Sequence, residues 1–404
     1  MREVALRIIV EGWRFLCHSY SVVNQFQMME MLKRPDLELF HRDMPYIDEG
    51  WKTEVSDRDR TTQALRNIPT PAPNQPADVT VRMYCPWNFA NSDSSQTWVF
   101  AATEWGTVTN NVLEGIGVSS LTETPVNSEA KIITCSQWSK AGFIRSGVQP
   151  NRITVVPLGV DTDIYHPLTN EQRTALRQAF GWQDSFIFLN IGGCTDRKGI
   201  RPLLKAFAAV IERYPHAKLV LKGSELLYPS KDDIAQASRA VLSDAEREKV
   251  AARVIYTGTQ LSFSQVAQLY QAADAYVSPY LAEGFNLPVL EAAACGLPVI
   301  CTQGGPTDDF THPDFALQIE SKLRPLTIDG ENFSILAPNL DHLIALMQAT
   351  IEETAIAARS RQFGPSFVAG KFTWKHAVDD LLHVFRTSET RAKINRLAFE
   401  PIIL

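Results

Sequence analysis

Two glutamates, Glu283 and Glu291, stand eight positions apart in residues 279–291, PYLAEGFNLPVLE. The residues from Phe285 onward predict a helix with Pro288 in its first turn, where a missing N–H costs little. Glu291 lies about two helical turns beyond Glu283, so both carboxylates are expected on the same side of the helix. The free backbone N–H groups at the start of that helix attract a phosphate or a sugar oxygen. One carboxylate can hold sugar hydroxyls or a developing cation, and the other can hold ribose hydroxyls. Glutamates at this spacing are more often solvated helix charges, so the surrounding elements must decide whether a sugar nucleotide binds here.

Apolar runs of strand length alternate with helical stretches, which predicts an α/β protein whose parallel sheets are covered by helices. Residues 158–167 predict a linker between two such series. Ligands of these folds bind beyond the carboxyl ends of the strands, in a cleft between the sheets. The predicted strands are residues 5–10, 37–40, 79–84, 97–101, 131–135 and 153–157, then 186–191, 218–222, 253–257, 275–279 and 298–302.

Helices are expected in the second half and at the end of the chain. Their predicted ranges are 200–214, 262–273, 288–294 and a closing helix over 374–385. Residues 51–76 are polar and hold four prolines near their end, which predicts an irregular excursion.

Length and charge narrow the class of protein. A chain of 404 residues suggests about two domains. A net charge of −6 argues against a general nucleic-acid binder, which is usually basic. No apolar run approaches the roughly 20 residues that span a bilayer, and no signal-peptide pattern opens the chain. The six cysteines form no CxxC pair, which predicts a reducing cytoplasm without a disulfide framework or zinc site.

Two Asp-x-Asp pairs imitate a metal-binding motif: Asp57 with Asp59, and Asp161 with Asp163. The first lies in a polar loop and the second in the predicted linker. Both are interpreted as solvated or capping residues, and no bound metal is expected.

Several ordered motifs make the chain resemble the family-4 retaining glycosyltransferases, the glycogen-synthase-like "group 1" transferases of the GT-B fold. The similarity covers about residues 131–310 and returns near residue 372, and it is weak over the first 130 residues. It rests on Ser136 to Ser139, the VVPLGVD run at 155–161, Arg197 to Gly199, LYQAAD at 269–274, EGF at 283–285, the CGLPVI run at 295–300, Gly304 to Asp308, and FTW at 372–374.

The resemblance implies two Rossmann-like domains with facing parallel sheets. Residues 1–165 would bind the acceptor, residues 166–375 would bind a nucleotide-sugar donor, and residues 376–404 would form a helix and tail that pack back. The expected reaction is transfer of a sugar, most simply a hexose, to an acceptor hydroxyl with retained anomeric configuration.

The family's basic pair contacts the donor diphosphate, and this chain departs from that pattern. Lys198 matches the family's lysine, but its arginine falls at Gly193. Arg197 is adjacent, although a neighbouring residue usually points elsewhere. One lost charge-assisted hydrogen bond is worth roughly 1.5–3 kcal/mol, which weakens donor binding about ten- to a hundredfold.

Other donor-side positions follow from the same resemblance. Glu283 would orient the sugar and Glu291 would hold the ribose. Asn286 replaces a usual glycine, and it tolerates unusual backbone angles better than most residues. Further positions implied at the donor are Gly284, Phe285, Leu287, Gly304 and Gly305, with Leu261 as a candidate for the base pocket.

The acceptor side is less defined. His18, in the segment after the first strand, is a candidate catalytic residue, against the alternative of a structural histidine. Ser19 and Tyr20 could meet an acceptor, and Trp105 could stack on a sugar ring. No strongly basic amphipathic helix indicates membrane association.

The resemblance implies front-side attack in an ion-pair-like transition state, with the leaving diphosphate taking the acceptor's proton. Lys198 and a helix N-terminus would stabilise that leaving group. No tightly bound cofactor is expected; the donor is a nucleoside-diphosphate sugar, with a UDP-sugar slightly favoured over a GDP-sugar. Two alternatives stay open: a non-catalytic sugar-nucleotide-binding relative, which Gly193 and Asn286 motivate, and an epimerase or phosphorylase on the same scaffold.

Overall fold

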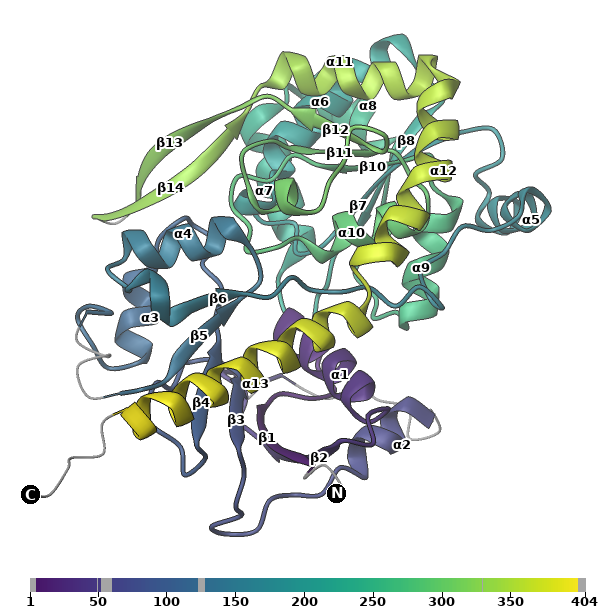
Figure 1. Ribbon diagram of the computed structural model, residues 1–404. Coiled ribbons are helices and arrows are strands. Elements are labelled where there is room, and N and C mark those ends of the chain that lie inside the picture. The colour runs from purple at the N-terminus through teal and green to yellow at the C-terminus, as the bar shows by residue number, and fades with distance from the viewer. Residues whose placement is uncertain (1–4, 49, 52–59, 123–127, 329, 399–404) are drawn as a thin grey trace, which may run out of the picture. The chain divides into compact units, whose positions relative to one another are not determined.

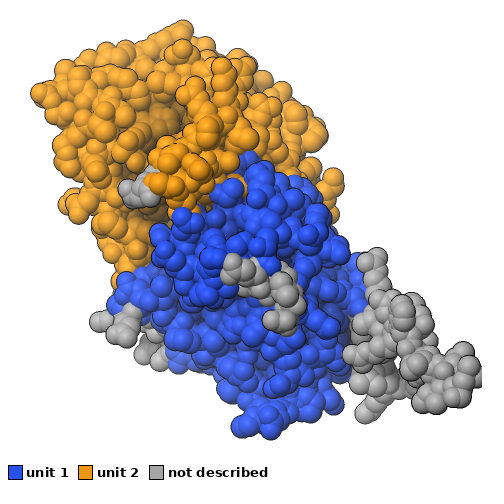
Figure 2. All heavy atoms as spheres, turned by 90° about the vertical axis from the view of Figure 1, so that its left-hand side faces the viewer, with its two compact units in different colours: residues 1–103, 107–158, 374–404 blue, residues 104–106, 159–373 orange. Residues whose placement is uncertain are grey.

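The computed structural model describes residues 5–48, 50–51, 60–122, 128–328 and 330–398 (Figure 1). The pair Asp57 and Asp59 lies outside these ranges. The chain divides into two compact units, coloured separately in Figure 2. Unit 1 comprises residues 1–103, 107–158 and 374–404, and unit 2 comprises residues 104–106 and 159–373.

Unit 1 is built on a six-stranded sheet in the order β2-β1-β3-β4-β5-β6, and every neighbouring pair is parallel. All six strands were predicted, with bounds that differ by a few residues at most. The strands are β1 (Leu6–Gly12), β2 (Leu37–Asp43), β3 (Val79–Met83), β4 (Gln96–Phe100), β5 (Lys131–Thr134) and β6 (Ile153–Val155). The helices are α1 (Ser19–Met31), α2 (Arg60–Arg66), α3 (Asn110–Gly115) and α4 (Gln137–Arg145), with the 3-10 turn η1 (Pro150–Arg152).

The last helix, α13 (Trp374–Ala398), belongs to unit 1 although the rest of that unit precedes residue 159. Its first residue, Trp374, stacks on Phe26 of α1 with ring centroids 5.4 Å apart. Asp379 accepts a hydrogen bond from Arg34, and Gln96 donates to the Phe385 carbonyl. The predicted return of the closing helix is therefore confirmed, and it contributes to the core of unit 1.

Unit 2 has a second six-stranded parallel sheet, in the order β12-β11-β10-β7-β8-β9. Its strands are β7 (Phe186–Ile191), β8 (Ala217–Lys222), β9 (Val254–Thr257), β10 (Ala275–Ser278), β11 (Val299–Thr302) and β12 (Ala316–Ile319). Its helices are α5 (Asn170–Phe180), α6 (Ile200–Arg213), α7 (Ser230–Val241), α8 (Asp244–Ala251), α9 (Phe263–Ala272), α10 (Leu287–Ala294), α11 (Leu340–Glu352) and α12 (Thr354–Lys371), with the 3-10 turns η2 (Asp196–Lys198) and η3 (Pro306–Asp309).

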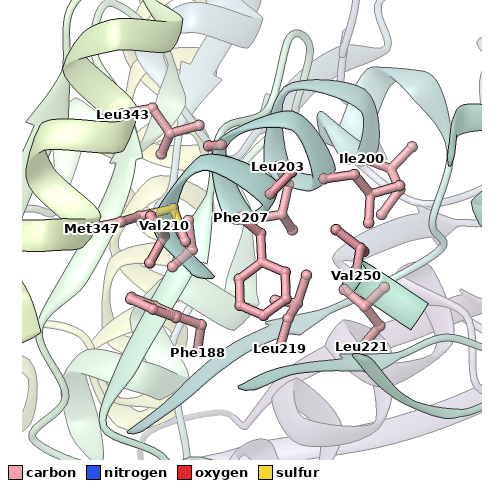
Figure 3. Close-up of a cluster of buried hydrophobic side chains, with 14 of the residues drawn as sticks. Phe188, Ile200, Leu203, Phe207, Val210, Leu219, Leu221, Val250, Leu343 and Met347 are labelled. Atoms are coloured by element: carbon pink, nitrogen blue, oxygen red, sulfur yellow. The ribbon is translucent and has the colours of Figure 1, made fainter. Parts of the chain in front are cut away.

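A buried cluster joins helices of unit 2 to its sheet (Figure 3). Phe207 of α6 lies among side chains of β7 and β8 and is fully buried. The apolar stripe of α6 faces the strands because its buried positions recur at helical spacing. Other members include Phe188, Leu203, Val210, Leu219, Leu221, Val250, Leu343 and Met347.

Three features depart from the sequence predictions. Residues 51–76 are not irregular throughout, because α2 forms within them. Strand β12 was not predicted. Unit 2 also carries an antiparallel hairpin, β13 (Ser321–Ile328) and β14 (Glu331–Pro338), which forms a separate two-stranded sheet and was not predicted either.

Candidate functional site

The strand order of unit 2 locates the candidate site. The chain leaves β7 toward β8 on one side, while β10 pairs with β7 on the other side. In parallel α/β sheets, the crevice between two such loops, at the carboxyl ends of the strands, is the usual ligand site. The two loops here are residues 192–199, which follow β7, and residues 279–286, which follow β10.

These two loops are in close contact. Gly199 has a φ of +78°, and a Cβ at this position would lie 1.9 Å from the Pro279 carbonyl oxygen. The backbone N–H groups of Leu281 and Ala282 donate to the Arg197 carbonyl at 2.8 and 3.2 Å. Only glycine fits at position 199, because a side chain would clash with the second loop and would be strained by the left-handed backbone.

Glu283 accepts hydrogen bonds from two consecutive basic residues. Glu283 is 3% exposed, and its carboxylate accepts from Lys198 Nζ and, at 3.4 Å, from Arg197 Nη1. Arg197 Nε also pairs with Glu104 at 3.2 Å. Burial alone would lower the pKa of the Arg197 guanidinium, but Glu104 and Glu283 raise it above its ordinary value. Arg197 and Lys198 thus converge on one carboxylate, although adjacent residues usually point apart.

At position 193, where the family resemblance placed an arginine, the ring of Tyr228 would have to shift to admit a side chain. A Cβ on Gly193 would lie 2.9 Å from Cδ2 of Tyr228, below any ordinary contact distance. The tyrosine ring therefore occupies the space beside Gly193, and the second cation of the loop is at 197.

Asn286 keeps the backbone conformation that a glycine would have at this turn. Its φ is 78° and its ψ is 62°, in the left-handed region. The Asn286 side chain donates to Ser278 Oγ at 2.9 Å and does not cap α10. Phe285 is buried and stacks on Phe310 with centroids 4.5 Å apart. Both side chains are used in packing. Residues 284–287 can therefore offer a ligand their backbone groups, at the start of α10.

Glu291 lies in α10 and has a different environment from Glu283. Tyr270 Oη, on α9, donates to Glu291 Oε2 at 2.7 Å. Burial raises the pKa of Glu291 to about 7, while hydrogen bonds from Tyr270 and Tyr165 lower it. As a whole residue, Glu291 is half-buried.

The remaining donor-side candidates lie in two other loops of unit 2. Gly304 and Gly305 follow β11, and the Gly304 N–H donates to Asp308 Oδ2 at 2.8 Å. A Cβ on Gly305 would lie 2.5 Å from the Tyr280 hydroxyl, so glycine allows close packing of this loop. Leu261 is half-buried between β9 and α9, and Leu287 opens α10.

His18, Ser19 and Tyr20 lie in unit 1, at the start of α1 and beyond the carboxyl end of β1. His18 is the N-cap of α1, and its Nδ1 accepts from the Tyr20 N–H at 3.3 Å. Its ring stacks on Trp51 at a centroid distance of 5.4 Å. Ser19 is exposed, and Tyr20 Oη accepts from Trp87 Nε1 at 3.1 Å. These contacts hold His18 in an aromatic loop at the start of α1.

Trp105 contacts the hairpin of unit 2. Its ring lies 5.1 Å from that of Phe333, and its carbonyl accepts from the Ser334 N–H at 2.9 Å. The Leu336 N–H donates to the Leu281 carbonyl at 2.8 Å, two residues before Glu283. The hairpin is thus attached to the candidate site. The Asp-Gly pair at 329–330 is the sequence signal that could have revealed it.

Asp161 of the second Asp-x-Asp pair accepts from the Asp163 N–H at 2.9 Å, a local turn contact. Among the described residues, no group of three or more His, Cys, Asp or Glu side chains could hold a metal ion. In the same part of the chain, none of the helices combines the length and apolar character needed to cross a bilayer.

Comparison with known proteins places these features in context. Residues 185–320 match the sequence family described as "Glycosyl transferases group 1". D-inositol 3-phosphate glycosyltransferase of Rhodococcus opacus is 30% identical over 244 residues, which cover 59% of this chain and 49% of that protein. The protein of the same name from Mycobacterium tuberculosis is 27% identical over 241 residues, or 59% and 45% of the two chains. The chain therefore spans about half the length of the curated relatives it matches.

Solved structures resemble the chain over nearly its whole length. HepE of Anabaena, crystallised with UDP and glucose, has a TM-score of 0.69 at 14% identity, covering 95% of this chain and 100% of that one. Sucrose-phosphate synthase of Thermosynechococcus elongatus has a TM-score of 0.63 at 16% identity, with the same coverage. At these identities the likeness establishes the fold.

Proposed function

The chain has the GT-B fold and carries a group 1 glycosyltransferase domain over residues 185–320, and on that premise we propose that it is a retaining glycosyltransferase. In this proposal it moves a sugar from a nucleoside-diphosphate sugar to an acceptor hydroxyl. Residues 1–165 bind the acceptor, residues 166–375 bind the donor, and residues 376–404 form the closing helix and tail.

The observation that carries the proposal is a pair of glutamates beside the loops that follow β7 and β10. One glutamate has cationic partners and the other has hydroxyl partners. Glu283 is paired with Lys198 and Arg197, and Glu291 is held by a tyrosine hydroxyl. A nucleotide sugar has an anionic diphosphate between two groups rich in hydroxyls. Two cations at the β7 loop suit the diphosphate, and two carboxylates suit the sugar and the ribose.

Arg197 takes the role of the missing arginine in this proposal. Its guanidinium and the Lys198 ammonium meet at the same carboxylate, so both can reach one diphosphate. Gly193 then contributes backbone beside Tyr228 rather than charge. The backbone of Gly284 to Leu287 faces the sugar, Gly304 and Gly305 approach the diphosphate, and Leu261 borders the base.

Catalysis in this scheme is electrostatic. Lys198, Arg197 and the start of α10 stabilise the negative charge that develops on the leaving diphosphate. Glu283 orients the donor sugar, and the diphosphate oxygen takes the proton of the acceptor hydroxyl as that hydroxyl attacks from the same face. Exclusion of water keeps hydrolysis from competing with transfer.

On the acceptor side, His18, Ser19, Tyr20 and Trp105 are the proposed contacts, and the acceptor is a carbohydrate or another small hydroxylated molecule. The names of the relatives support this class, since they act on an inositol phosphate. We propose a UDP-sugar as the first donor to test, because HepE was crystallised with UDP and glucose. A cytoplasmic location accords with a donor of this kind.

The test is calorimetric titration of UDP, GDP and ADP into the wild type and into Glu291→Ala. One nucleotide is expected to bind in the micromolar range, and the substitution should weaken it at least tenfold. Release of free sugar from the matching nucleotide sugar then distinguishes an enzyme from a non-catalytic relative. Binding without any turnover would favour the non-catalytic alternative, and a requirement for inorganic phosphate would favour a phosphorylase.

A further inference from the structure

Glu291 is surrounded by tyrosines from three different segments of unit 2. Tyr270 of α9 donates to it at 2.7 Å, and Tyr165, from the segment before α5, forms a second side-chain hydrogen bond. The rings of Tyr165 and Tyr270 are 6.0 Å apart in an edge-to-face arrangement, and both side chains are buried. Two hydroxyls from separate elements thus hold one carboxylate on a residue that is itself half-buried.

A third tyrosine connects this group to the β7 loop. Tyr276 of β10 lies 5.6 Å from the ring of Tyr270 and is fully buried. Its hydroxyl donates to the Ile191 carbonyl at 3.3 Å, immediately before Gly192. Tyr276 therefore links Tyr270 to the backbone at the end of β7, while the hydroxyls that reach Glu291 are those of Tyr165 and Tyr270.

We propose that Tyr270 and Tyr165 are positioning residues that hold Glu291 for a ribose, and that a nucleotide sugar displaces a proton from Glu291 when it binds. This inference rests on the proposed function. Glu283 differs, because two cations accompany its carboxylate, whereas hydroxyl groups accompany Glu291. A carboxylate without a cationic partner in a poorly solvated place favours its protonated form. Two ribose hydroxyls donating to the carboxylate would favour the ionised form, so the proton leaves to solvent.

The other titratable groups around Glu291 stay neutral near physiological pH. Burial raises the pKa of Tyr165, Tyr270 and Tyr276 well above the ordinary value, and the pKa of Cys295 in α10 is raised as well. Burial also raises the pKa of Glu291, to about 7. Within this set, Glu291 is the group expected to change charge between pH 6 and pH 8.

The experiment is calorimetric binding of UDP-glucose and GDP-mannose to the full chain at pH 6 and pH 8. These donors are used because a free terminal phosphate has a second pKa near 6 and would release protons of its own. At pH 6, the binding enthalpy should vary with the ionisation enthalpy of the buffer, corresponding to release of nearly one proton. Affinity at pH 6 should be about tenfold lower than at pH 8.

Three variants complete the design. Glu291→Gln should bind weakly, with no proton release and no change of affinity between the two pH values. Tyr270→Phe should weaken binding about tenfold and move the midpoint of the pH dependence upward, which a general structural defect would not do. Tyr276→Phe is the matched control: it removes a buried tyrosine hydroxyl that bonds to backbone rather than to Glu291, and it should leave the midpoint unchanged.

Binding of either donor without proton release at pH 6 overturns the inference and leaves the proposed function standing. An unchanged midpoint in Tyr270→Phe overturns the positioning role. If neither donor binds, nor UDP, GDP or ADP, the proposed function fails and the inference fails with it.

Discussion

At the scale of single residues, the charge of Glu283 opposes the charges that would hold a diphosphate. Its carboxylate neutralises Lys198 and Arg197 in the unliganded protein. Glu283→Gln should therefore bind UDP several-fold more tightly, since the anion no longer competes with a carboxylate for the two cations. Turnover of UDP-glucose should fall at least a hundredfold in the same variant, because the sugar loses its orienting group.

Calorimetry with UDP and a sugar-release assay measure the two effects separately. Glu104→Gln is the control, because Glu104 also pairs with Arg197 but its side chain is more exposed than that of Glu283. It should raise UDP affinity less and leave sugar release largely intact. Weaker UDP binding by Glu283→Gln would contradict this account of the cation pair.

The raised pKa of Glu291 also predicts how the free energy of unfolding depends on pH. Its pKa rises from 4.5 to about 7 on folding, so between these values the native state binds more protons than the unfolded chain. The stabilisation from this group is therefore complete below pH 4.5 and is lost as the pH rises through 7, a loss on the order of 3 kcal/mol. Urea unfolding of the wild type and of Glu291→Gln at pH 5 and pH 8 checks this. Since glutamine does not titrate, the wild type should lose the extra stability and the variant should not; an equal change in both would contradict the assignment.

At the scale of elements, the site depends on close contact between the loops after β7 and β10. Gly199→Ala places a methyl group 1.9 Å from the Pro279 carbonyl oxygen at a φ of +78°. It should destabilise the protein by at least about 3 kcal/mol, since overlap adds to backbone strain. Gly181→Ala is a matched control, because its φ is +67° but nothing lies within 4 Å of the new Cβ. It should cost only about 1–2 kcal/mol. Urea unfolding of the two variants measures the difference, and equal losses would show that loop contact matters little.

The same elements show what could be predicted from the sequence. Strand β7 was predicted with its observed bounds, because FIFLNI is an apolar run interrupted only by Asn190 and bounded by turn residues. The orientation of Arg197 was not predictable from its adjacency to Lys198. It depends on the 3-10 turn η2 and on the N–H groups of Leu281 and Ala282, which come from a loop more than 80 residues later.

The hairpin was missed for a different reason. Strand β13 is largely exposed and contains Pro325, and β14 is mainly half-buried, so neither strand has the apolar run of a central strand. Its attachment to Trp105 and Leu281 is a tertiary contact without a local sequence signal. The glutamate pair could be singled out because both residues lie in one short motif. The tyrosines beside Glu291 come from positions 165 and 270, so their contact with it became visible only in the folded structure.

At the scale of the whole molecule, each of the two units has its own sheet. Unit 1 combines the first part of the chain with residues 374–404 at its end. Every donor-side residue proposed here lies in unit 2, while His18, Ser19 and Tyr20 lie in unit 1. A ligand stabilises the state that binds it by RT ln(1 + [L]/Kd), about 2.7 kcal/mol at a hundredfold excess over Kd. UDP should therefore slow hydrogen exchange mainly in peptides of unit 2.

Mass spectrometry of hydrogen exchange with and without UDP resolves the units by peptide. The strongest protection is expected in the β7 loop and in α10, and β8 should follow as part of the same core. Peptides of β1, β3 and α13 should exchange at nearly unchanged rates, with α13 behaving like β1 although it is far away in sequence. Equal protection of both units would mean that UDP stabilises the molecule as one cooperative body, and the donor role could then not be assigned to unit 2 alone.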